Sequence, residues 1–154
     1  MIVVSDTSPI TTLIQAGRVD LLHKLYGEVL IPEAVRAELS VSHQSLPDFF
    51  LCVPAADRGE VKRLLAELDP GEAEAIILAK ERHADLLLID ENEGREVATR
   101  EGIRFIGLVS VLVESKLKGF IPSLREIFRE IEKETTFFIS VEIKNLALKR
   151  AGEL

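Results

Sequence analysis

The stretch Ala84-Asp85-Leu86-Leu87-Leu88-Ile89-Asp90 decides the fold class of this chain. Its apolar residues form an almost continuous run of strand length, which is typical of a buried strand. Helical patterns over residues 72–83 and 93–101 flank it, and Gly102 closes the second of them. A buried strand between two helices predicts an α/β fold with a mainly parallel sheet.

The same alternation extends to both ends of the chain. Further strands are predicted over 1–5, 28–31, 49–53 and 104–106, and further helices over 8–16, 18–26, 33–39, 58–68, 107–118, 122–133 and 140–151. This pattern indicates a three-layer α/β/α sandwich with a helical C-terminal region. We expect a single domain over residues 1–154, in which 134–154 is a candidate C-terminal docking helix.

Composition limits the classes of function. The chain has 154 residues, of which 47% are hydrophobic and 29% are charged, as in a globular protein. It has no apolar run near the ~20 residues that span a bilayer and no signal-peptide pattern. Its one cysteine excludes an internal disulfide, so we expect a cytoplasmic protein. The net charge of −7 disfavours non-specific coating of nucleic acid but permits a metal-dependent enzyme that acts on it.

Two acids directly follow predicted strands. Asp6 comes after the strand 1–5, and Asp90 comes after the strand 84–89. In an open parallel sheet, ligands bind at the carboxyl ends of the strands, so both side chains are candidates for one site. Each alone is equally consistent with a helix N-cap.

Two further acids are placed by helical periodicity. Glu38 projects into the apolar arc of the helix 33–39, where a carboxylate needs a partner or a metal. Glu72 shares a helix side with small apolar residues, whereas Glu74 points about 200° away, a direction that predicts solvent. The alternatives are a salt bridge for Glu38 and stabilisation of the helix dipole by Glu72.

These four carboxylates, Asp6, Glu38, Glu72 and Asp90, are predicted to converge at one end of the sheet. Their mutual repulsion would destabilise the cluster unless a divalent cation bound there. Oxygen ligands favour Mg²⁺ or Mn²⁺, which activate water for phosphodiester hydrolysis.

The motifs around these acids resemble the PIN domain family, the nuclease fold of VapC toxins. The segment 3–10 (VVSDTSPI) matches the first motif, Glu38 the second acid, and Glu72 and Asp90 the third and fourth acids. The resemblance is closest to an uncharacterised prokaryotic PIN-like subfamily with a Gly-Arg after the fourth acid. It covers residues 1 to about 119 and, less specifically, the C-terminal helices. It departs from the VapC pattern, which usually has Asp where this chain has Glu72 and Thr or Ser where it has Ile89.

The resemblance implies a ribonuclease that uses Mg²⁺ or Mn²⁺, often dimeric, and in toxin–antitoxin systems an antitoxin partner that blocks the site. Catalysis is assigned to Asp6, Glu38, Glu72 and Asp90, and metal binding to Asp6, Glu72, Asp90 and Glu93, with Glu91 as a neighbouring candidate. Thr7 and Ser8 support Asp6 or a metal-bound water, or cap the next helix. Arg95 contacts phosphate, or is an ordinary surface arginine.

Other classes of function fit the sequence less well than a metal-dependent nuclease. A phospho-receiver domain and a haloacid-dehalogenase-like phosphatase need acids that the sequence lacks near Asp6, and a dinucleotide-binding domain needs a glycine-rich loop after the first strand. The main alternative is a PIN-like binding or regulatory module with little or no nuclease activity.

Overall fold

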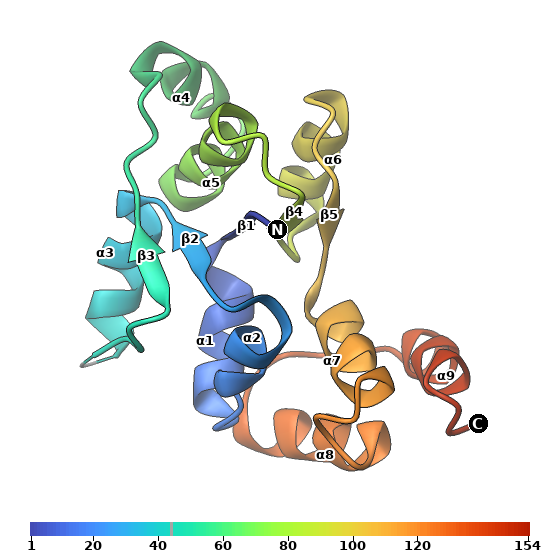
Figure 1. Cartoon of the computed structure of the whole chain (residues 1–154). Coiled ribbons are helices and arrows are strands. Elements are labelled where there is room, and N and C mark those ends of the chain that lie inside the picture. The colour runs from blue at the N-terminus through green and yellow to red at the C-terminus, as the bar shows by residue number, and fades with distance from the viewer. Residues whose placement is uncertain (44) are drawn as a thin grey trace.

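The computed structural model, which describes residues 1–43 and 45–154, is built on a five-stranded parallel sheet (Figure 1). The strands lie in the order β3-β2-β1-β4-β5, with β1 in the centre. Their bounds are β1 Val3–Ser5, β2 Val29–Ile31, β3 Phe50–Cys52, β4 Leu86–Leu88 and β5 Phe105–Ile106. Every described pairing is parallel, which confirms the predicted fold class.

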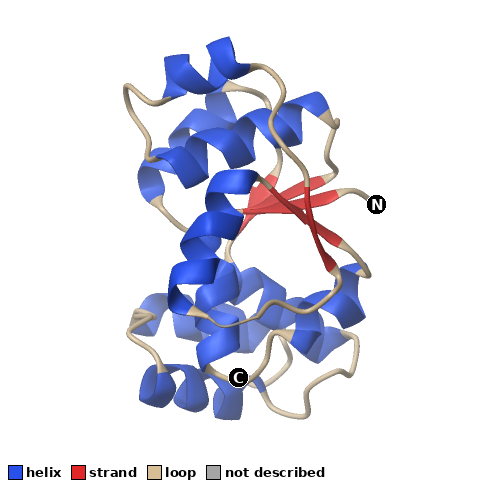
Figure 2. Cartoon of the chain, turned by 90° about the vertical axis from the view of Figure 1, so that its left-hand side faces the viewer, coloured by secondary structure: helices blue, strands red, loops and turns tan. Residues whose placement is uncertain are grey.

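Helices cover both faces of the sheet and give the three predicted layers (Figure 2). One layer contains α1 Thr7–Gln15, α2 Asp20–Tyr26, α7 Leu108–Leu117, α8 Leu124–Glu134 and α9 Val141–Arg150. The opposite layer contains α4 Arg58–Leu64, α5 Pro70–Glu81 and α6 Asn92–Arg100. The helix α3, Glu33–Ser42, contacts both α1 and α5 and so joins the two layers.

Alternation along the strands divides the interior into two cores. Val3 and Leu88 pack with the helices of the α1 layer, whereas Val4, Leu87 and Ile89 pack with α5 and α6. Because successive side chains of a strand point to opposite faces, a strand buried on both faces must be apolar throughout. This is the physical reason that 84–89 reads as a continuous apolar run.

The predicted helices and strands are present, with ends that differ by a few residues. The helix α1 begins at Thr7 and α5 begins at Pro70, both earlier than predicted, and the side chain of Asp69 caps the start of α5. Conversely, α4 ends at Leu64 instead of residue 68. In the ranges 1–43 and 45–154, no helix is long and apolar enough to cross a membrane.

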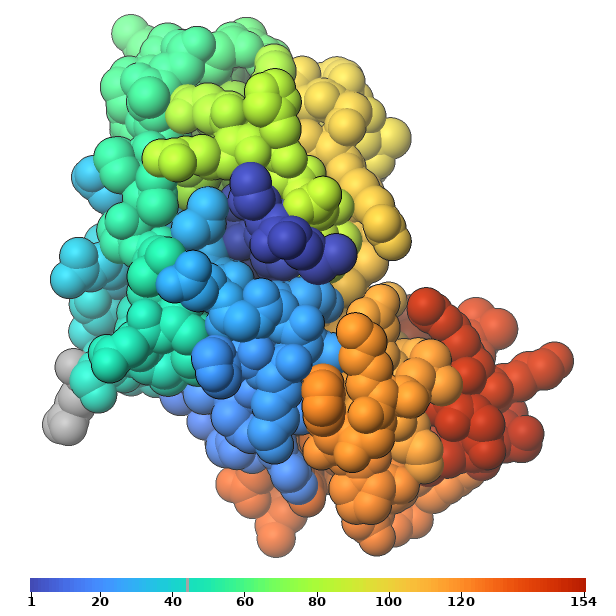
Figure 3. Space-filling model, viewed as in Figure 1, coloured from blue at the N-terminus to red at the C-terminus, as the bar shows by residue number. Residues whose placement is uncertain are grey.

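The C-terminal helix α9 packs against α7 and projects at one side of the molecule (Figure 3, red). Its contact with the core is made by the buried residues Ala147 and Leu148. Val141 and Leu146 on the same helix are 66% and 70% exposed, so the described residues of this chain do not cover them.

Candidate active site

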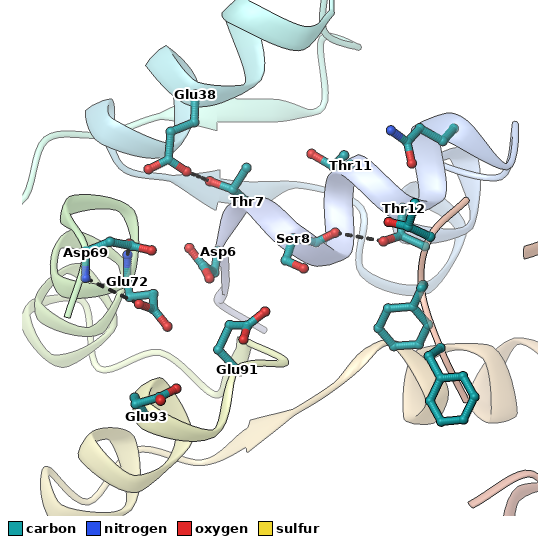
Figure 4. A pocket seen from close by; sticks show the side chains of 14 residues that line it. Asp6, Thr7, Ser8, Thr11, Thr12, Glu38, Asp69, Glu72, Glu91 and Glu93 are labelled. Carbon is teal, nitrogen blue, oxygen red and sulfur yellow. Dashed lines mark hydrogen bonds between the residues drawn. The ribbon is translucent and has the colours of Figure 1, made fainter. Parts of the chain in front are cut away.

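The order of the strands creates one crevice at the carboxyl end of the sheet. From β1 the chain proceeds to β2 on one side, and it later returns to β4 on the other side. Such a switch point leaves a gap between the connections that leave the two neighbouring strands, and ligands of open α/β sheets bind there. A pocket of about 630 Å³ lies at this point. It is lined by six acids from separate segments (Figure 4): Asp6, Glu38, Asp69, Glu72, Glu91 and Glu93.

Asp6 lies in the middle of these acids (Figure 4). It occupies the N-cap position of α1, but its side chain makes no capping hydrogen bond within the described chain. The residue is only 4% exposed. Burial, followed by the charges of Asp69, Glu72 and Glu38, raises the pKa of Asp6 to about 7, although the Thr7 N–H opposes this rise. The N-cap position therefore does not explain this carboxylate, whose charged form is costly without a cation.

Glu38 enters the pocket from α3 and accepts a hydrogen bond from the Thr7 hydroxyl (Figure 4). Thr7 follows the N-cap of α1, so it does not cap this helix, and the donation of its hydroxyl to Glu38 is a contact that the sequence analysis does not predict. A Cβ at Gly71 would lie 2.8 Å from Glu38 Oε1, so a larger residue there would displace this carboxylate. Ser8 also lines the pocket.

Glu72 forms a capping box with Asp69 at the start of α5. The Glu72 N–H donates to Asp69 Oδ1 at 2.8 Å, and the Asp69 N–H donates to Glu72 Oε1 at 3.3 Å. This confirms the alternative that Glu72 stabilises the start of its helix, but only one of its oxygens does so. Glu72 Oε2 is buried and has no hydrogen-bond partner among the described residues. Burial, with the Asp69 charge, raises the pKa of Glu72 to about 7.

Asp69 is a pocket residue that the sequence analysis missed. The spacing of Asp69 and Glu72, with Pro70 at the first helical position, is the pattern of a capping box and would have placed Asp69 beside Glu72.

Glu74 differs from the prediction. It was expected to face solvent, but it is only 7% exposed. Its Oε1 accepts a hydrogen bond from the Ala34 N–H at 3.0 Å, and its Oε2 pairs with Arg58 at 3.2 Å. The reason is that α3 and α4 cover the side of α5 that helical periodicity alone assigns to water.

Asp90 lies in a neighbouring pocket of about 420 Å³ and is not among the residues that line the pocket around Asp6. Its Oδ1 accepts the Leu108 N–H at 3.0 Å, at the start of α7, and lies 3.5 Å from Arg95 Nη2. Burial raises the pKa of Asp90. Asp90 Oδ2 is buried without a hydrogen-bond partner among the described residues, as Glu72 Oε2 is, and Glu91 lines both pockets, so the metal-binding role of Asp90 stays a prediction.

Arg95 is held by the protein itself. Its Nε donates to the Ile89 carbonyl oxygen at 3.0 Å, and its guanidinium lies 5.6 Å from the centre of the Phe105 ring. With the Asp90 pair, these contacts give Arg95 a structural position between β4 and α7. These contacts hold the Arg95 side chain within the protein. They match neither the predicted contact with phosphate nor an ordinary surface arginine.

The pocket residues fit a hydrated divalent cation. The donors are all oxygens, the pKa values of Asp6 and Glu72 are raised, and Glu72 Oε2 is buried without a described partner. Among the described residues, 1–43 and 45–154, no three acidic, histidine or cysteine side chains are arranged to hold one ion directly. Mg²⁺ usually keeps several of its waters in proteins, so carboxylates around a hydrated ion match the chemistry of this set.

Comparison with known proteins agrees with the fold. A family model described as a PIN domain matches residues 2–153, nearly the whole chain. A comparison with curated proteins returned no match. The match confirms the resemblance predicted from the motifs around Asp6, Glu38, Glu72 and Asp90, and it includes the C-terminal helices. The chain belongs to the PIN domain family.

Proposed function

We propose that this protein is a metal-dependent ribonuclease that hydrolyses RNA phosphodiester bonds in the pocket around Asp6. PIN domains are typically nucleases and commonly use divalent metals. The observation that carries the proposal is the convergence on one pocket, at the switch point of the sheet, of acids from the end of β1, from α3 and from the starts of α5 and α6. The toxin role, the antitoxin partner and the dimer that the resemblance implies stay predictions.

Asp6, Glu72, Glu91 and Glu93 are the residues that would hold Mg²⁺ or Mn²⁺, directly or through water. When bound, such an ion supplies charge neutralisation at the phosphate and a water of lowered pKa. Asp6 contributes most, since its carboxylate is the most deeply buried of the four and has no capping role. Glu72 contributes Oε2, while its Oε1 stays in the capping box.

Glu38 is suited to orient the attacking water and accept its proton. The hydrogen bond from Thr7 holds Glu38 Oε2, and Oε1 has no hydrogen bond from the described residues. A general base must lie within hydrogen-bond reach of the proton that it removes. Gly71 helps to fix the carboxylate, because it allows α5 to pack closely against Glu38.

The proposal is tested by two substitutions on α5. Glu72→Gln removes a charge from the pocket, and we expect it to reduce metal-dependent cleavage at least about 100-fold, because even residues that only support metal ligands cost 10- to 100-fold. Glu74→Gln is the matched control, since Glu74 lies two residues away, is equally buried and pairs with Arg58 outside the pocket. We expect it to retain cleavage within about 3-fold.

The measurement is cleavage of single-stranded and structured RNAs with Mn²⁺, with Mg²⁺ or with EDTA. Equal loss in both variants, or undiminished cleavage in EDTA, would contradict the proposal. Absence of cleavage on every RNA by folded wild-type protein would favour the alternative, a binding or regulatory module.

A further inference from the structure

The pocket around Asp6 has a second end that carries no charge. Ser8, Thr11, Thr12 and Gln15 line it, and their spacing of three and four residues places them on one face of α1. Thr136, Phe137 and Phe138, from the segment between α8 and α9, complete this end. In Figure 4, Thr11 and Thr12 lie away from Glu72, and the phenyl rings of the lining lie on the side of Thr12. We call this region the neutral end.

Phe138 is held in an exposed position by its neighbours. The Thr135 hydroxyl donates to the Ile131 carbonyl oxygen at 2.7 Å and accepts the Phe137 N–H at 3.1 Å, which ties the segment to the end of α8. On the other side of Phe138, Ile139 is only 2% exposed and belongs to the core. Phe138 is 81% exposed between these two anchors. The segment therefore presents a large aromatic face at the pocket instead of burying it.

The charge of the pocket makes such a contact necessary for RNA. Among the described residues that line the pocket, none is Lys or Arg, and the chain has a net charge of −7. Phosphate neutralisation, which supplies most of the affinity of basic RNA-binding proteins, is therefore not available from the lining side chains. Beside a bound cation, the lining itself can add affinity only through contacts to uncharged parts of the substrate.

We propose that the neutral end binds an unpaired nucleobase next to the scissile phosphate, with the base stacked on Phe138. This inference rests on the proposed ribonuclease function and specifies the substrate as single-stranded at that position. Aromatic side chains stack on bases of any sequence, because every base has a π-face. Thr11 supplies a hydroxyl, and Gln15 supplies an amide with both donor and acceptor groups for the edge of the base. A base inside a duplex cannot reach Phe138 without leaving its stack.

The first test uses fluorescence and does not depend on cleavage. The chain contains no tryptophan, so Phe138→Trp creates a single reporter at an exposed position. Val141→Trp is the matched control, because Val141 is 66% exposed nearby but does not line this pocket. Each variant is titrated in Ca²⁺, a cation that binds carboxylate oxygens, with a short single-stranded RNA and with an abasic oligomer of the same length and charge.

We expect the RNA to quench Phe138→Trp saturably and to leave Val141→Trp unchanged. The abasic oligomer is expected to bind about 5- to 100-fold more weakly. Equal quenching of Phe138→Trp by both oligomers would mean that only the backbone is bound and would overturn the proposal. Absence of quenching by the RNA would also overturn it.

The second test separates this inference from the nuclease itself. Phe138→Ala and Phe138→Leu are expected to raise the KM for single-stranded RNA about 5- to 100-fold with a smaller change in kcat, and Phe138→Tyr is expected to restore it. If wild-type protein cleaves RNA in a Glu72-dependent manner and Phe138→Ala cleaves equally well, the base site is wrong and the nuclease stands. If Phe138→Trp is quenched by RNA but wild-type protein shows no metal-dependent cleavage, the nuclease is wrong and the base site stands.

Discussion

Asp6→Asn is expected to reduce metal-dependent RNA cleavage on the order of 1000-fold, which corresponds to about 4 kcal/mol of lost transition-state stabilisation. Asp6 is the acid around which the other pocket acids are arranged (Figure 4), and it is only 4% exposed. The substitution removes the charge that would hold the cation while it keeps the size and polarity of the side chain. Since Asp6 makes no capping hydrogen bond within the described chain, α1 loses no cap.

The measurement is the initial rate of cleavage with Mn²⁺, together with the circular dichroism spectrum of each protein. Asp20→Asn is the control, because Asp20 lies in the first turn of α2 with an exposed side chain paired to Lys24. We expect this control to cleave like the wild type and both variants to keep the wild-type spectrum. Cleavage by a pure preparation of Asp6→Asn at the wild-type rate would exclude the assigned role of Asp6.

The same variant is expected to be more stable than the wild-type protein in EDTA at pH 8. The pKa of Asp6 is raised from 3.8 to about 7, chiefly by burial. Between these pH values the folded protein binds a proton that the unfolded chain has released, so the free energy of unfolding falls as the pH rises from about 4 to about 7. The loss is on the order of 2 to 4 kcal/mol and is complete above pH 7. Asparagine does not ionise, so the Asp6→Asn variant does not lose this stability as the pH rises.

Chemical unfolding of both proteins in EDTA from pH 4.5 to pH 8 measures this effect as the difference in free energy of unfolding. The difference cancels other groups, such as Glu101 and Glu153, whose pKa values are lowered and whose stabilisation is lost at low pH. Addition of Mn²⁺ at pH 8 is expected to stabilise the wild type and to have little effect on Asp6→Asn. If the difference in free energy of unfolding between the two proteins stays constant with pH, the carboxyl group of Asp6 does not have the raised pKa described above.

The fold was predictable from the sequence because its signals are local. A strand that is buried on both faces has to be apolar throughout, and helices have to alternate with parallel strands, so the pattern around 84–90 indicated the architecture. The acids at strand ends and on the inner faces of helices could be predicted for the same reason. Asp6, Glu38 and Glu72 do line one pocket, because parallel strands place their carboxyl ends at the same edge of the sheet.

The exact membership of the site was decided by tertiary structure. The chain beyond β4 keeps its alternation, so Asp90 points to the same face as Leu88 and meets the start of α7, while Glu91 reaches the pocket. Periodicity gives the opposite directions of Glu72 and Glu74, but only the packing of α3 and α4 on α5 shows that both are buried.

The sequence by itself therefore determined the layers, the strand ends and the inner faces of the helices, since these depend on neighbours a few residues apart. Only the tertiary structure decided which acids share a cavity and that Phe138 stands at its neutral end. These features depend on residues more than a hundred positions apart, as in the joint lining by α1 and the segment before α9, and no local pattern specifies how such segments meet.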